Sequence, residues 1–320
     1  MDVAEQRISA WTGGRLNLSF LGLQSLPELP DGLAELRADH NHFTTLPELP
    51  VSLTMLLVHG NELRSLPPLP ANITRLSCYE NYLTTLPALP DGITSIWSQS
   101  NELVSLPTLP ASLLDLNVCG NQLVSLPHLP DGLIHIMCHQ NRLRKLPEIP
   151  NSLKSLWCGK NKLTALPKLS MGLSELFCQQ NKLTSLPELP TSITMLMCHE
   201  NKLTELPVLP VGLKMLDCTN NQLVDLPELP SGLTDLRCNG NKFPDRLTGE
   251  SISDFVERLE RIKSHKRTIA RCKRYKEGLM MACWNTRRLH RIILGNPTNQ
   301  WNHEWRVYGD LEFTTVDEIL

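Results

Sequence analysis

Aromatic residues are scarce in this chain. Phe, Trp and Tyr together make up 5% of its 320 residues, whereas proline contributes 24 residues and leucine dominates the apolar set. Motifs of common catalytic and nucleotide sites, such as the P-loop, HExxH and GxSxG, are missing as well. This composition is typical of a repetitive scaffold and not of a compact enzyme.

Long hydrophobic runs are missing too. No window supplies the roughly 20 apolar residues of a membrane-spanning helix. The first residues, MDVAEQRISAWTGG, have neither the basic head nor the apolar core of a secretory signal. We therefore expect no membrane span and a cytoplasmic location. Bacterial injection signals need no apolar core, so the cytoplasm of a host cell fits equally well.

What the sequence has in abundance is repetition. An asparagine recurs every 20 residues from Asn41 to Asn241 without an insertion. The copy at residues 173–190 reads LSELFCQQNKLTSLPELP, with leucine or cysteine at six apolar positions. An earlier copy, in which Leu21 replaces the asparagine, brings the number of coils to twelve. A fixed period of this length indicates a solenoid whose stacked coils share one core.

The spacing within a copy predicts its local structure. In LFCQQN, Leu176 and Cys178 should enter the core while the residues between them face solvent, as in a short strand. The asparagine amide can satisfy backbone groups of adjacent coils. The LPELP segment has few N–H donors and should run as extended polyproline II. We expect short parallel strands on a concave side and extended segments on a convex side.

The unit LxxLxLxxNxLxxLPxLP resembles the leucine-rich repeat, in the 20-residue LPX variety of bacterial effectors of the IpaH and YopM class. The resemblance covers about 230 of the 320 residues. It implies a leucine-rich-repeat solenoid of about 12 repeats at residues 14–243, after an N-terminal cap at residues 1–13. A small, basic, α-helical region should follow at residues 244–320.

Seven cysteines share one inward slot, three residues before the asparagine. They are Cys78, Cys138, Cys158, Cys178, Cys198, Cys218 and Cys238. Stacked parallel side chains rarely offer the torsion of a disulfide, so free thiols in a reducing compartment are expected. A metal ladder of thiolates is the alternative, which their position among leucines disfavours. No cofactor is expected. Cys119 is offset to an outward slot, which predicts a reactive thiol.

Outward strand positions carry the candidate binding residues. The central slot holds Met137, Trp157, Phe177 and Met197 in consecutive coils, which predicts a continuous apolar ridge. The remaining candidates are Trp97, Met195 and Met215, with Tyr79, His139 and His199 at the rim. Aromatic anchors with a polar rim are typical of a protein interface. The alternative is that strands simply tolerate such residues.

The histidines of this face do not form a metal-binding pattern in the sequence. His139 and His199 are three coils apart, about 14 Å, which is too far to share an ion. His135 and His139 share a coil but have no obvious third ligand. We therefore expect the rim histidines to form hydrogen bonds and predict no metal site.

The period stops after Asn241. The segment SISDFVERLERI has helical spacing with Ser251 or Ser253 as N-cap, and two or three helices are expected before residue 296. Covering the open end of the solenoid is the simplest role for them. The block EGLMMACWNTRRLHRII also resembles a short C-terminal block of proteins from large double-stranded DNA viruses, although Thr286 stands in place of its proline.

Charge is distributed unevenly along the chain. The net charge is −2, but residues 241–320 carry 15 Lys and Arg against 11 Asp and Glu. A basic helical stretch can contact nucleic acid or simply face solvent. We expect a protein partner and regard nucleic acid as the less favoured one. An H-x6-C-x10-C-x6-H array from His265 to His290 departs from the usual spacing of zinc ligands.

Catalysis is not expected. Relatives of the IpaH class carry a ubiquitin-ligase domain whose nucleophile lies in a Cys-x-Asp motif, and no cysteine here has Asp two residues on. A ligase-like effector therefore remains only an alternative. The sequence predicts a non-catalytic scaffold that binds a host or cellular protein on the concave face of its repeats.

Overall fold

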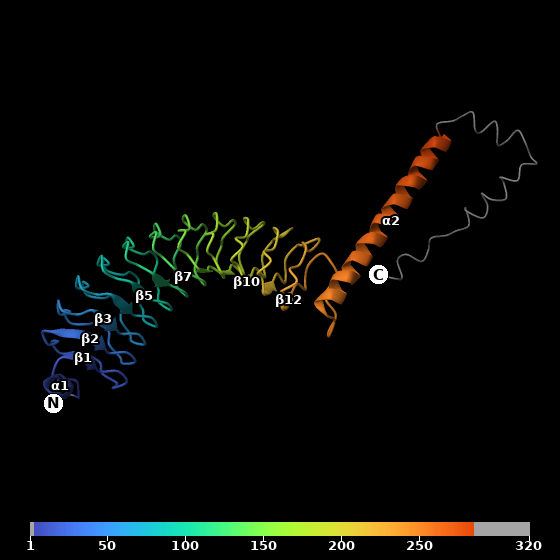
Figure 1. The fold of residues 1–320 in the computed structure, drawn as a ribbon. Helices are drawn as coiled ribbons and strands as arrows, with labels where there is room; N and C mark the ends of the chain where they lie inside the picture. Colours follow the sequence, from blue (N-terminus) through green and yellow to red (C-terminus); the bar gives the residue numbers. More distant parts are fainter. Residues whose placement is uncertain (1–2, 285–320) are drawn as a thin grey trace, which may run out of the picture. The chain divides into compact units, whose positions relative to one another are not determined.

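A single parallel sheet of twelve short strands organises the repeats. The computed structural model describes residues 3–284, with side chains for residues 4–275. The strands follow one another in sequence order, each pairing only with its predecessor and successor. Their bounds are Gly14–Asn17 (β1), Leu33–Arg37 (β2), Met55–Leu57 (β3), Arg75–Ser77 (β4), Ser95–Trp97 (β5), Asp115–Asn117 (β6), His135–Met137 (β7), Ser155–Trp157 (β8), Glu175–Phe177 (β9), Met195–Met197 (β10), Met215–Asp217 (β11) and Asp235–Arg237 (β12). Figure 1 shows the coils following an arc with the strands on its inner side.

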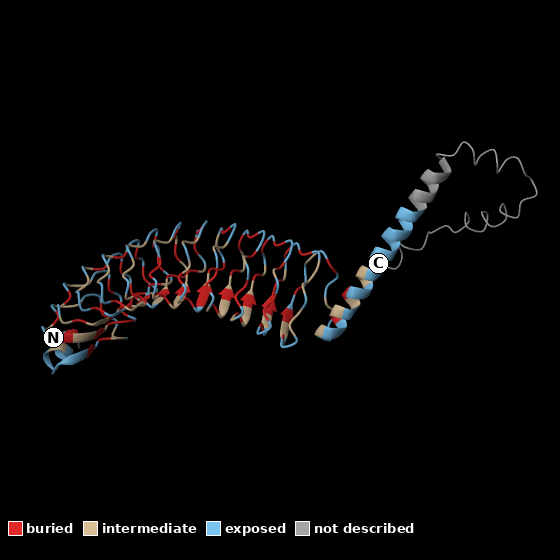
Figure 2. Cartoon of the chain, turned by 45° about the horizontal axis from the view of Figure 1, so that its top comes forward, coloured by how far each residue is buried: buried red, intermediate tan, exposed pale blue. Residues whose placement is uncertain are grey.

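The strand pattern follows from the repeat spacing. Leu176 and Cys178 are fully buried, whereas Glu175 and Phe177 on either side of the leucine are half-buried. Leu176 pairs with Leu196 of the next strand, so that one coil corresponds to 20 residues. Figure 2 shows buried and half-buried residues along most strands of the stack. The predicted leucine-rich-repeat solenoid is confirmed, and its segments with paired prolines form neither helix nor strand.

The asparagine column holds adjacent coils together. Asn141 Nδ2 donates to the carbonyl oxygens of Cys138 in its own coil (3.1 Å) and Val118 in the preceding one (2.9 Å). Its Oδ1 accepts from the backbone N–H of Leu123 at 3.0 Å. The same set recurs from Asn41 to Asn221 with little change in distance. One amide therefore satisfies three backbone groups that packing would otherwise leave unpaired.

A left-handed residue precedes every asparagine of the column, which the sequence pattern did not reveal. Its φ lies between 51° at Lys160 and 70° at Gly240, and before eight of the eleven asparagines this residue is not glycine. Such a conformation costs about 1–2 kcal/mol for a residue with a Cβ. Flanking backbone bonds hold it in place; for example, Gln140 N donates to Gly159 O at 2.9 Å.

The cysteine column is a row of buried, free thiols. Cys78, Cys158 and Cys178 are completely buried, and none of the seven forms a disulfide. Burial raises the pKa of the Cys78 and Cys178 thiols to about 12, so they remain protonated at neutral pH. The prediction that these residues pack inward is confirmed.

The prediction for Cys119 is wrong. Its side chain is only 6% exposed, and its Sγ lies 2.8 Å from Nδ1 of His139 in the next coil. Burial raises the pKa of this thiol to about 12, which disfavours the nucleophilic thiolate. The slot does point outward, but the neighbouring imidazole lies against the sulfur.

Helices occur at both ends of the described chain. Helix α1 (Val3–Ser9) lies within the segment expected to cap the N-terminal end. Helix α2 spans Ile252–Trp284, and Asp254 N donates to Ser251 Oγ at 3.1 Å, which confirms Ser251 as N-cap. The expectation of several short helices is wrong up to Trp284, because α2 continues without a break. Residues 285–296 of that expectation, and most of the virus-like block, lie outside the described residues.

The chain divides into two compact units between Glu250 and Ser251. The first contains the repeats, and α2 belongs to the second. Covering the end of the solenoid with α2 stays a prediction. No helix in the described part of the chain is long and apolar enough to cross a membrane.

Replacing one column asparagine should destabilise the repeats measurably. Asn141→Ala leaves Val118 O, Cys138 O and Leu123 N without their partner, and a buried unsatisfied group costs about 1–3 kcal/mol. We expect the free energy of unfolding, measured by urea denaturation, to fall by at least about 2 kcal/mol. Asn151→Ala, at an exposed asparagine, should change it by less than about 0.5 kcal/mol. Equal losses of unfolding free energy in the two variants would show that the asparagine column does not hold adjacent coils together.

Alkylation should distinguish the thiols of the native chain. In iodoacetamide at pH 8, we expect Cys272, which is exposed, to react while the eight repeat cysteines stay unmodified, because they are buried and protonated. Peptide mapping by mass spectrometry assigns each modified site. The urea-denatured chain is the control, in which all of them should react. Native labelling of Cys158 or Cys178 at the rate of Cys272 would contradict the inward placement.

Candidate functional site

Four apolar side chains form one line across neighbouring strands. Met137, Trp157, Phe177 and Met197 are directly paired in register from β7 to β10, and each is half-buried. We call this set the ridge. Asn117 precedes it on β6 and Asp217 follows it on β11. The ridge therefore has a polar residue at either end.

The aromatic centre of the ridge is held in a fixed geometry. The rings of Trp157 and Phe177 stack with centroids 5.0 Å apart and an interplanar angle of 27°. Trp157 Nε1 donates to Oε2 of Glu175 at 3.2 Å, and Ser155 Oγ donates to the same oxygen at 2.9 Å. A stacked pair of this kind contributes about 0.5–1.5 kcal/mol beyond area burial. The indole is therefore oriented before any partner arrives.

Methionines extend the ridge on one side. Met195 pairs with Met215 in register, and both are half-buried. An unbranched thioether side chain adapts to irregular surfaces, which suits an interface. The predicted methionines therefore lie on β10 and β11, the strands of Met197 and Asp217, and Met195 pairs with Glu175 of β9.

The rim residues His139 and His199, on the other side of the ridge, are less exposed than an outward strand position indicates. His199 Nδ1 lies 3.4 Å from Oδ2 of Asp217, whose other oxygen accepts from Thr219 N. His139 contacts Cys119 and lies 6.4 Å from the Trp157 ring. Burial, with a smaller effect from Lys160, lowers the pKa of His139, so its neutral form is favoured.

Two of the predicted residues lie apart from the others. Trp97 is 45% exposed on β5, and Asn117 separates it from Met137 in the register. Tyr79 stacks on the His59 ring at 4.2 Å, farther toward the N-terminus. The structure therefore brings eight of the ten predicted residues onto β7–β11 or directly beside these strands.

A group near the N-terminal end was missed in the sequence. The ligand atoms of Asp39, His40 and His59 all lie within 4.8 Å of one another. Asp39 and His59 occupy the same slot in adjacent coils, and His40 follows Asp39. The spacing D-H-x18-H predicts that these three residues lie close together, once the 20-residue period is used to align equivalent positions of adjacent coils.

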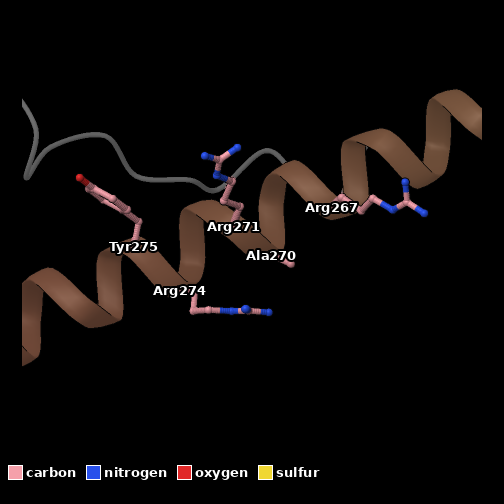
Figure 3. Close-up of a pocket in the computed structure, with 5 residues that line it drawn as sticks. All are labelled: Arg267, Ala270, Arg271, Arg274 and Tyr275. Atoms are coloured by element: carbon pink, nitrogen blue, oxygen red, sulfur yellow. The ribbon is translucent and has the colours of Figure 1, made fainter.

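Helix α2 carries a different kind of surface. Eight Lys and Arg lie between Arg261 and Lys276, with no Asp or Glu in that stretch. The described residues lining a pocket along this helix are Arg267, Ala270, Arg271, Arg274 and Tyr275. Figure 3 shows Arg271 and Tyr275 on one side of the helix and Arg274 on the other. The positive charge surrounds the helix and does not converge on one point.

Comparisons place the repeats among known proteins. No protein-family profile and no curated protein sequence matches the chain. YopM from Yersinia enterocolitica is 33% identical, over 74% of this chain and 67% of that chain, with a TM-score of 0.48. YopM from Yersinia pestis, a leucine-rich effector protein, is also 33% identical, over 71% of this chain and 83% of that chain, with a TM-score of 0.47.

Another solved structure has a similar fold. The functional domain of InlJ from Listeria monocytogenes, which includes a cysteine ladder, is 25% identical with a TM-score of 0.59. The match covers 71% of this chain and 53% of that chain. With the repeat length, the asparagine column and one third identity across most of a YopM chain, this protein belongs to the leucine-rich-repeat family of 20-residue, LPX-type repeats.

Proposed function

We propose that this chain is a non-catalytic scaffold that binds a host or cellular protein on the strand face of its repeats, with the ridge at the centre of the contact. The observation that carries this proposal is the aromatic pair. Trp157 and Phe177 are stacked, and Glu175 holds the indole, although both rings remain partly open to solvent. An ordered aromatic pair loses little conformational entropy on binding.

The chemistry around the pair indicates the partner. Adaptable apolar surface flanks the pair, with Met137 next to Trp157 and Met197 next to Phe177, and Met195 and Met215 extend it on β10 and β11. Asn117 and Asp217 supply polar groups at the ends. An apolar centre with a polar rim matches a protein surface that presents aliphatic or aromatic side chains, as interface cores do. An interface of standard size would bury about 1,600 Å² in total.

The free thiols favour a reducing compartment for this function. Seven buried cysteines in successive or nearby coils remain unpaired. Disulfides are rare in the cytoplasm, where thiols are kept reduced. With the similarity to a leucine-rich effector protein, this supports a role as an effector in the cytoplasm of a host cell.

No catalytic role is proposed. A ligase of the related class needs an accessible cysteine with an aspartate two residues on. Among the described residues, Cys272 is the exposed cysteine, and Lys273 and Arg274 follow it.

Removing the aromatic pair should abolish binding while the fold persists. Trp157→Ala with Phe177→Ala removes two central anchors, and a hot-spot residue contributes at least about 2 kcal/mol, so affinity should fall by at least about 30-fold. The measurement is crosslinking and pulldown from lysate, compared by mass spectrometry for the wild type and the variant. Proteins captured by the wild type should be lost.

The control variant removes exposed apolar side chains away from the ridge. Tyr82→Ala with Val208→Ala should retain the same captured proteins, since both residues are exposed outside the strands. The urea midpoint of the ridge variant should stay close to that of the wild type. Loss of both capture and stability in the ridge variant would show that the aromatic pair is structural, and capture retained by the ridge variant would show that the pair does not bind the partner.

A second candidate function rests on α2. Its stretch from Arg261 to Lys276 carries eight basic residues without an acidic one, so it could bind a polyanion such as RNA or DNA. Arg267, Arg271 and Arg274 are among them, and Tyr275 could stack on a base. This function needs no contribution from the ridge.

Salt dependence tests the second candidate. If α2 binds a mixed-sequence single-stranded RNA, affinity should fall steeply with salt, and Arg267→Gln, Arg271→Gln and Arg274→Gln together should reduce the slope by about two, because each phosphate contact contributes about 0.7 on a single strand. The control replaces three exposed lysines of the repeats, Lys162→Gln, Lys182→Gln and Lys202→Gln. A smaller slope in the control alone would place the binding on the repeats.

A further inference from the structure

The cluster of Asp39, His40 and His59 has the composition of a metal site. One carboxylate and two imidazoles offer ligand atoms within 4.8 Å of one another. Among the described residues, no other group of three such side chains is as close. We propose that these three residues bind a divalent cation of the zinc class. The cluster lies directly after β2 and β3, away from the ridge, so this proposal does not rest on the proposed function.

The carboxylate of Asp39 is buried and oriented. Asp39 is only 8% exposed, and Ser19 Oγ donates to its Oδ1 at 2.6 Å. The other oxygen, Oδ2, lies 3.7 Å from Nε2 of His59. A carboxylate held through one oxygen presents the second to an ion, which is how outer hydrogen bonds orient ligands in known metal sites.

His59 is fixed at its other nitrogen. Ser77 Oγ lies 3.3 Å from Nδ1, and the Tyr79 ring stacks on the imidazole at 4.2 Å with an interplanar angle of 13°. These two contacts set the plane of the ring. Nε2 is thereby directed toward Asp39 and is the atom available to a cation.

His40 lies between a ring and a glycine. Phe20 stacks on it at 4.4 Å with an interplanar angle of 21°. On the opposite coil, a Cβ added to Gly60 would approach His40 Nδ1 to 2.6 Å, so the position needs glycine for this ring to lie where it does. Since His40 is exposed while Asp39 is buried, an ion can reach the cluster from the solvent side.

The ligand set indicates the class of ion. Imidazole and carboxylate suit Zn²⁺ and related divalent cations, whereas Mg²⁺ and Ca²⁺ prefer oxygen alone. Ligand atoms bound about 2.0–2.1 Å from a tetrahedral ion are about 3.3 Å apart. The Asp39 to His59 separation of 3.7 Å needs only a small adjustment, and the separations that involve His40, at most 4.8 Å, must shorten when an ion binds. Three protein ligands leave the fourth position for water.

Another coil offers a natural comparison. His199 lies 3.4 Å from Asp217, which resembles the pairing of His59 with Asp39. The residue before its asparagine is Glu200, and Gln180 Nε2 donates to that carboxylate at 3.0 Å. Glu200 is therefore not directed at His199 and Asp217 as a third ligand. His199→Ala provides a matched control for the variants of the proposed metal site.

Metal titration of the full chain tests the site. After removal of bound metal with a chelator, Co²⁺ is titrated and the visible absorption of four-coordinate cobalt is recorded, with Zn²⁺ calorimetry for stoichiometry. We expect His59→Ala, His40→Ala and Asp39→Asn each to lose one equivalent of bound metal relative to the wild type and to His199→Ala. Equal stoichiometry in all of these chains would overturn the proposal, even if other cysteines or histidines bind metal.

Two gentler variants keep the test independent of folding. Ser19→Ala removes the hydrogen bond to Asp39 and should lower the affinity of this site for the metal ion about 10- to 100-fold. Gly60→Ala should displace His40 and lower the metal affinity by a similar factor. The control is Gly120→Ala, whose φ of 61° nearly matches the 64° of Gly60, but whose Cβ would meet no atom closer than 3.6 Å. If Gly60→Ala and Gly120→Ala retain the same affinity while both stay folded, His40 is not a ligand.

Discussion

The side-chain amide of the repeated asparagine is the interaction on which the rest of the molecule depends. Each one satisfies two carbonyl groups and one N–H that lie in different coils, as Asn141 does for Val118, Cys138 and Leu123. Because these groups are buried, a shift of one residue would leave several of them unpaired at once. The column therefore fixes the rotation of each coil relative to its neighbour and makes the period invariant.

An invariant period turns sequence positions into columns. Two residues that are 20 positions apart pair across neighbouring strands. The side chains of an inward position, such as Leu176 or Cys178, therefore stack into a continuous buried column. The outward slots become surfaces in the same way. Met137, Trp157, Phe177 and Met197 make a ridge because they share one column, and no long-range folding event is needed to assemble them.

The same rule builds chemically different sites on one scaffold. At β7–β10 the outward column is apolar and suits a protein partner. Directly after β2 and β3, a carboxylate and two imidazoles from adjacent coils converge instead. Neighbouring contacts determine which residues can act: Glu175 orients Trp157, while Ser19 and Ser77 orient Asp39 and His59. A solenoid can therefore carry separate functions along its length without changing its backbone.

The sequence by itself determined the coil length, the inward placement of Leu176 and Cys178, and the order of side chains along the strand face, because alternation and a constant period depend only on local spacing. The burial of Cys119 and the meeting of Asp39, His40 and His59 were decided by the tertiary structure. How far a side chain is covered depends on the rotamers of the next coil, and the direction of His40 depends on a left-handed backbone. Neither is encoded in the spacing of apolar residues.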